Sequence, residues 1–93
     1  MKARIVSIKN GLQEFDEVEM IRVKSQRHTL LIMQNYMPVI GELDGYVELV
    51  FENHTSRLEG LKGYFMHKKN LFSLIVEEGD TTPVEVEEET YAG

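Results

Sequence analysis

The sequence predicts an all-β fold, a small β-sandwich of short antiparallel strands. Three observations predict it: β-branched and aromatic residues gather in short segments, turn signals separate these segments at close intervals, and no segment has a convincing helical period. Residues 58–65 could be forced into a helix, but Gly60 and Gly63 would each weaken it by about 1 kcal/mol relative to alanine. With 93 residues, of which 42% are hydrophobic, the chain has the size and composition of one folded domain.

The first half of the chain is expected to contain three strands. Residues 2–8 are strand-like, and the Asn10-Gly11 pair that follows favours a tight hairpin turn. Residues 15–23 form the next expected strand, in which the apolar positions change parity, as they do at a β-bulge. Residues 29–33 are apolar on both faces, which predicts a buried strand.

The second half begins with its least regular part, residues 34–45, where Pro38 holds the preceding residue in extended geometry. Residues 46–52 alternate cleanly, so one face of this strand belongs to the core. Further strands are expected at residues 57–61, 64–66 and 71–76, the last two joined by a turn at 67–70. The predicted core consists of Val47, Leu49, Phe51, Phe65, Phe72 and Leu74.

The net charge of −6 belongs to the C-terminal end of the chain. Residues 1–76 hold all 10 Lys and Arg with 9 acids, and residues 77–93 hold the other 7 of the 16 acids with no base. Charge repulsion and a shortage of apolar residues predict a disordered acidic tail over residues 79–93. We therefore divide the chain into a folded body, residues 1–78, and this tail.

No pattern in the sequence points to catalysis, a cofactor or a metal. The chain has no cysteine, which excludes disulfides and thiol nucleophiles and fits a reducing compartment. Its histidines, His28, His54 and His67, have no ligand at metal-binding spacing and are expected at the surface. The carboxylates of residues 14–19 are also expected at the surface, and no glycine-rich phosphate loop is present. An enzyme is therefore the least favoured class of function.

The same composition limits the partners. Residues 1–76 carry a net charge of only +1 (10 bases against 9 acids), which argues against nucleic-acid binding. No apolar run approaches the ~20 residues that span a bilayer, so direct membrane insertion is not expected. We expect a cytoplasmic protein that meets a membrane only through a complex.

Two segments are candidates for binding a protein partner. The irregular apolar stretch at residues 36–40 is either packed beneath the sheets or in contact with a partner. The basic turn at residues 67–70 could take an anion or remain solvated, and we expect it at the opposite end of the sandwich. The candidate contact residues are Tyr36, Met37, Pro38, His67, Lys68 and Lys69, with Tyr36 foremost.

Four segments also match a known family in order: E-V-E-M-I-R-V at 17–23, L-L-I-M-Q-N-Y-M-P-V-I at 30–40, L-D-G-Y-V at 43–47 and G-Y-F-M at 63–66. Together they resemble the N-terminal domain of the F-type ATP synthase epsilon subunit over residues 2–78. The resemblance implies a β-sandwich without an active site that docks on a gamma-like stalk subunit or the rotor ring. Tyr36 stands at the family's G-H-A-P histidine, and no counterpart of its second, helical domain follows. A free-standing epsilon-like adaptor for an unrelated protein partner is the alternative.

Overall fold

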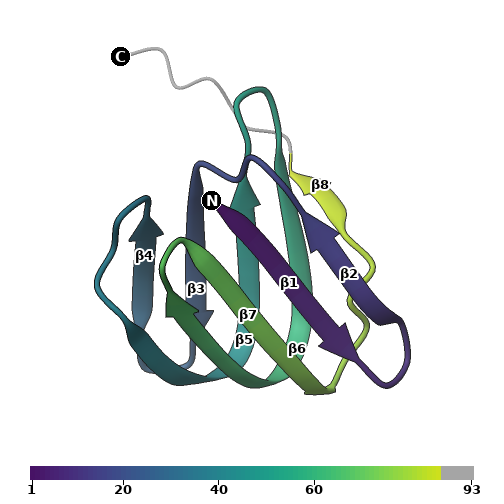
Figure 1. The fold of residues 1–93 in the computed structure, drawn as a ribbon. Coiled ribbons are helices and arrows are strands. Elements are labelled where there is room, and N and C mark those ends of the chain that lie inside the picture. The colour runs from purple at the N-terminus through teal and green to yellow at the C-terminus, as the bar shows by residue number, and fades with distance from the viewer. Residues whose placement is uncertain (87–93) are drawn as a thin grey trace, which may run out of the picture.

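The computed structural model describes residues 1–86, and all of their regular structure is β-strand (Figure 1). The all-β prediction is therefore confirmed. The strands are β1 (Lys2–Ser7), β2 (Gly11–Phe15), β3 (Met20–Ser25), β4 (Thr29–Met33), β5 (Val39–Val50), β6 (Thr55–Lys68), β7 (Leu71–Glu78) and β8 (Val84–Val86). The structure contains no helix in residues 1–86 that is long and apolar enough to cross a membrane.

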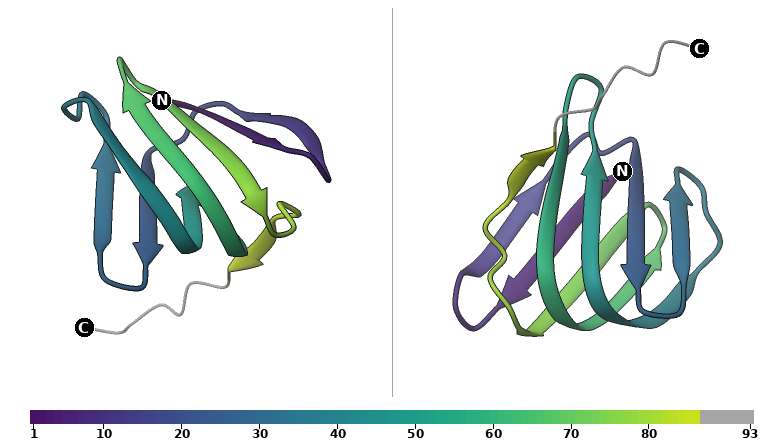
Figure 2. Two further views of the ribbon diagram at one scale, coloured as in Figure 1. Left: turned by 90° about the horizontal axis from the view of Figure 1, so that it is seen from below. Right: turned by 180° about the vertical axis from the view of Figure 1, so that it is seen from behind.

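The strands form one continuous sheet in the order β2-β1-β7-β6-β5-β3-β4, with β8 paired to β6. Neighbours are antiparallel except β1 and β7, which are parallel. The long strands β5 and β6 carry the sheet from one layer into the other, and Figure 2 shows the two layers facing each other. Among the strands of residues 1–86, the first half of β5 pairs only with β6, whereas its second half also pairs with β3.

The bends in β5 and β6 depend on glycines. The ladder between these strands shifts register between Gly45 and Val47, and the ladder between β6 and β7 shifts between Lys62 and Gly63. A Cβ at Gly45 would lie 2.1 Å from the carbonyl oxygen of Lys24, and one at Gly63 would lie 2.0 Å from that of Ile75. Only glycine lets the neighbouring strands approach this closely at the bends.

The core lies between the layers and is built from alternate residues of the strands. Five of the six predicted core residues are buried, and the sixth, Phe51, is partly buried against the core. The buried apolar side chains are Ala3, Ile5, Val18, Ile21, Val23, Ile32, Leu43, Val47, Leu49, Leu58, Leu61, Phe65, Phe72, Leu74 and Val76.

Two strand predictions in the first half are wrong. Residues 15–23 are not one bulged strand, because β2 ends at Phe15 and β3 begins at Met20, with Glu17 between them in a left-handed turn (φ 56°). The apolar positions change parity where the chain crosses from one layer to the other, and Val18 is buried in this connection. Residues 29–33 do not form a buried strand either, since β4 is an edge strand in which only Ile32 is buried.

In the second half the strands are longer than predicted. β5 begins at Val39 and has 12 residues, so the stretch expected to be irregular is half strand. β6 has 14 residues and unites the predicted strands at 57–61 and 64–66. Gly45 and Gly63 lie inside these strands, where they permit the bends, although glycine is a residue type that commonly marks turns.

The expected disorder of the tail is wrong for residues 79–86. Thr81 is fully buried, and its hydroxyl contacts the side chains of Ser7 (3.4 Å) and Gln13. The Thr81 N–H donates to Asn10 Oδ1 (3.1 Å), and its carbonyl accepts from Gln13 Nε2 (3.1 Å). β8 then pairs with Thr55–Arg57 of β6. Hydrogen bonds hold this segment in place, although charge repulsion and a shortage of apolar residues predict disorder. Residues 87–93 lie outside the described residues.

Candidate protein-docking surfaces

The two candidate segments lie side by side at one end of the molecule, so the expectation of opposite ends is wrong. The Asn35 N–H donates to Asn70 Oδ1 (2.6 Å), and Asn70 Nδ2 donates to Asn35 Oδ1 (3.2 Å). The segment after β4 must reach this end because Val39, the first residue of β5, pairs with His67 near the end of β6. We call residues 34–38 and 67–70 together the asparagine corner.

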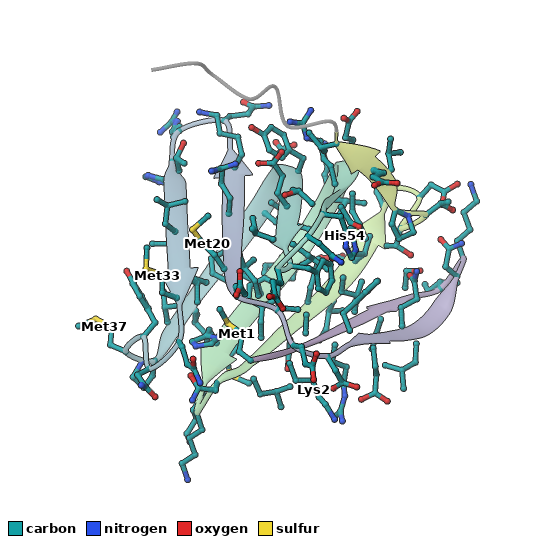
Figure 3. All side chains as sticks on the ribbon, turned by 90° about the horizontal axis from the view of Figure 1, so that it is seen from above. Met1, Lys2, Met20, Met33, Met37 and His54 are labelled. Atoms are coloured by element: carbon teal, nitrogen blue, oxygen red, sulfur yellow. The ribbon has the colours of Figure 1, made fainter. Side chains whose placement is uncertain are left out.

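In the asparagine corner, Tyr36 is held by contacts with the sheet, whereas Met37 is exposed. The Tyr36 N–H donates to the Met33 carbonyl (3.1 Å), and the half-buried ring meets His67 edge-on, with ring centroids 6.5 Å apart. Met37 is 70% exposed and projects away from the sheet in Figure 3, and Pro38 beside it is exposed. The packing alternative therefore holds for Tyr36, whereas Met37 and Pro38 are exposed and their contact with a partner stays a prediction.

His67 is fully buried, so its expected surface position is wrong. It follows Gly63 and Phe65 on the inward side of β6, an alternation that the sequence already contained. Neither ring nitrogen has a hydrogen-bond partner among residues 1–86. Burial, with a smaller contribution from the positive charge of the terminal amine, lowers the pKa of His67 and favours the neutral ring. Lys68 and Lys69 are exposed and remain available to a partner.

An exposed apolar surface, which no single segment of the sequence predicts, lies on the outer face of β6, β7, β1 and β2. Tyr64 lies opposite Ile75, Ile75 beside Val6, and Val6 opposite Leu12. These side chains, which we call the apolar row, are 53%, 58%, 41% and 57% exposed, respectively. Alternation within each strand predicts which side chains face outward, but only the register between strands aligns them.

The apolar row and the asparagine corner are continuous. Met66 and Ile40, both exposed, lie opposite each other on β6 and β5, and they share a hollow of about 250 Å³ with Pro38 and Lys68. Lys2, on β1, lies at the same level of the sheet as Lys68, since both register with Leu71 of β7. The surface therefore combines an apolar centre with cations toward the corner.

The outer face of the other layer carries a polar cluster whose members pair with one another. Glu48 is buried among Arg22 and Arg57, and Arg57 donates to Glu48 Oε2 from Nε (3.0 Å) and Nη2 (2.7 Å). Burial alone would raise the pKa of Glu48, but hydrogen bonds from Arg57 and Arg22 outweigh it and hold this pKa below its ordinary value. The Arg57 guanidinium also covers the Tyr46 ring at 4.7 Å. This cluster ties three strands together.

The carboxylates that the sequence analysis expected at the surface are there. Glu14, Asp16, Glu17 and Glu19 are all exposed, and the first two pair with Arg4 (3.3 Å) and Lys2 (3.6 Å). Within residues 1–86, no three His, Asp or Glu side chains come together in a way that could hold a metal ion.

Comparisons with known proteins bear on the fold. No family model matches the sequence, and no curated protein matches it. Among solved structures, the chain is similar to one from the central stalk and c-ring of the Tetrahymena thermophila mitochondrial ATP synthase, with a TM-score of 0.64 and 17% sequence identity. The match covers 84% of this chain and 63% of the other. The chain thus shares its fold with part of an ATP synthase stalk and ring assembly.

Proposed function

We propose that this chain is a non-catalytic docking domain that resembles the epsilon N-terminal domain and binds a gamma-like stalk subunit or the rotor ring of an ATP synthase. The observation that carries the proposal is the continuous surface formed by the apolar row and the asparagine corner. The similarity to a chain of an ATP synthase central stalk and c-ring supports the choice of partner. The protein would then associate with a membrane complex through its protein partner.

The exposed side chains fit a protein partner better than solvent. A single exposed apolar residue needs no explanation, but an aligned row across four strands is typical of an interaction surface. Tyr64 and Met66 belong to residue types that are enriched in the cores of interfaces. Lys2 and Lys68 lie toward the corner, so we expect acidic residues on the facing part of the partner.

The asparagine corner supplies the second part of the proposed contact. Met37, Pro38, Lys68 and Lys69 would touch the partner, and Tyr36 would contribute the exposed part of its ring. His67 supports Tyr36 from beneath. Tyr36→Ala should weaken binding by about 1–2 kcal/mol while the fold persists.

The test uses Ile75→Glu, at the centre of the apolar row, with Leu31→Glu on the outer face of β4 as the matched control. Both residues are exposed, so both variants should fold. We expect Ile75→Glu to weaken capture of a co-expressed gamma-like stalk subunit by roughly tenfold or more, and Leu31→Glu to leave it unchanged. Equal capture by the two variants would contradict the proposal. Row-dependent capture of an unrelated protein would favour the adaptor alternative.

A further inference from the structure

The sheet leaves a cleft of about 770 Å³ between the β3–β4 hairpin and the first half of β5. Its floor is apolar and consists of Val23, Leu30, Val39 and Phe65. The Phe65 ring lies across Gly41, where a Cβ would come within 2.7 Å of the ring. The absence of a side chain at position 41 therefore keeps the floor flat beside β5.

One wall of the cleft is a strand edge with polar backbone groups. β3 pairs with β5 only from Gly45 onward, so no strand of residues 1–86 pairs with this side of the first half of β5. The Ser25 hydroxyl shows which backbone groups face the cleft: it donates to the Glu42 carbonyl (3.1 Å) and accepts from the Asp44 N–H (3.3 Å). Because the N–H and C=O groups of successive residues point to opposite sides of a strand, those of Ile40, two residues before Glu42, also face the cleft.

We propose that this cleft accepts an extended peptide segment of a partner protein, which adds a strand to the edge of β5 at Ile40 and at the Glu42 N–H. An unpaired strand edge beside an apolar floor fits such an occupant, because main-chain hydrogen bonds hold it while alternate side chains enter the cleft. The inward positions of the segment would be apolar, to cover Val23, Leu30 and Phe65, and the outward positions polar.

The charged residues at the rim of the cleft indicate what net charge the bound segment should have. Arg27 and His28 stand on the hairpin side, and Glu42 and Asp44 on the β5 side. Opposite charges on the two sides favour a segment without large net charge of either sign. The cleft meets the proposed stalk-docking surface at Ile40, whereas the apolar row itself lies on the outer face of β6, β7, β1 and β2.

The experiment titrates the full chain, labelled with ¹⁵N, with a capped peptide of zero net charge, acetyl-Lys-Val-Thr-Val-Thr-Val-Glu-amide. We expect chemical-shift changes confined to the cleft residues. Two further peptides carry N-methyl groups on either the valines or the threonines. A strand added to one edge directs only alternate N–H groups at β5, so one methylated peptide should bind roughly tenfold more weakly than the other. Equal binding of both, or no binding of the parent peptide, overturns the proposal.

A variant tests the same hydrogen bonds from the protein side. Ile40→Pro removes the N–H that faces the cleft and leaves the β5–β6 ladder, which does not use this group, intact. Ile40→Val keeps the N–H and is the control. We expect the proline variant to lose roughly tenfold in affinity for the parent peptide and the valine variant to bind like the wild type. If Ile40→Pro does not fold, the methylated peptides decide the question with the wild-type chain. Concentration-dependent shifts at the cleft without peptide would mean that a second copy fills it and would overturn the proposal.

Discussion

The Asn35 N–H donates to the side-chain carbonyl of Asn70, and the side-chain NH₂ of Asn70 donates to the side-chain carbonyl of Asn35. Both residues adopt left-handed backbone conformations, with φ of 65° and 61°. The Asn70 carbonyl also accepts from the Lys2 N–H (3.0 Å). One turn residue therefore holds together the β4–β5 connection, the β6–β7 turn and the start of β1.

Substitutions at Asn70 should separate these contributions. Asn70→Gly keeps access to the left-handed conformation but removes both side-chain hydrogen bonds, so we expect a loss of about 1–2 kcal/mol in unfolding free energy. Asn70→Ala also strains the backbone and should cost about 1 kcal/mol more. Urea denaturation measures both. Equal stabilities of Asn70→Gly and the wild type would show that the reciprocal pair contributes nothing.

His67 should make the protein less stable in mild acid. Its folded-state pKa lies below the ordinary value of 6.5, so below that pH the unfolded chain binds a proton that the folded protein excludes. The free energy of unfolding should therefore fall by up to about 1.4 kcal/mol per pH unit from pH 6.5 down to the lowered pKa. His67→Leu removes this dependence on pH. It should also stabilise the fold at neutral pH, because it removes two buried ring nitrogens that have no hydrogen-bond partner among residues 1–86. Thermal melts of both proteins at pH 7.5 and 5.5 provide the comparison.

Glu48 should matter to stability at neutral pH. Glu48→Gln removes the charge that pairs with Arg22 and Arg57, and we expect a loss of about 1–3 kcal/mol. Glu59→Gln, whose side chain is exposed and pairs only with Arg57 among residues 1–86, should cost under about 0.5 kcal/mol. The folded-state pKa of Glu48 is lowered, so its contribution is present above the ordinary value of 4.5 and is lost as the pH falls through the lowered pKa. The difference between the two variants should shrink accordingly below pH 4.

Thr81 should anchor the segment after β7. Thr81→Val keeps the shape of the side chain but leaves Ser7 and Gln13 without their hydroxyl partner, which should cost about 1–3 kcal/mol. Thr82→Val, at an exposed neighbour, is the control and should cost less than about 0.5 kcal/mol. A chain that ends at Glu78 should be less stable than one that ends at Val86 by at least the Thr81→Val difference. Indistinguishable melting curves for these two chains would show that Thr81 does not hold the segment.

The sequence predicted the fold class and five of the 15 buried apolar residues because alternation is local. Val47 and Leu49, like Phe72 and Leu74, share a face two residues apart, and the structure buries all four. The lengths of β5 and β6 could not be predicted in this way. Glycine usually marks a turn, but Gly45 and Gly63 lie inside bent strands, where the backbone of a neighbouring strand comes close to them. The exposure of β4 followed from its place at the edge of the sheet, which its own residues do not encode.

The docking surfaces were predictable only in part. Residues 36–38 and 67–69 were identified individually, but their proximity depends on the pair Asn35 and Asn70, which lie in separate turns. The apolar row depends on the register of β6, β7, β1 and β2, and no single segment contains it. The burial of Thr81 was not predicted, because the sequence does not distinguish a threonine whose hydroxyl is buried and hydrogen-bonded from one whose hydroxyl is solvated.

The parallel pairing of β1 with β7 has a consequence for biosynthesis. Ala3 and Ile5 are buried beside Phe72 and Leu74, so these early residues cannot reach their final environment until β7 has left the ribosome. Until then the β1–β2 hairpin carries its apolar side chains without cover, which makes it a target for chaperones on the nascent chain. Closure between the two ends of the sequence is also slow, and domains dominated by such distant pairings fold over roughly milliseconds to seconds. The domain should therefore complete its folding only after β7 is made, as a late and cooperative event.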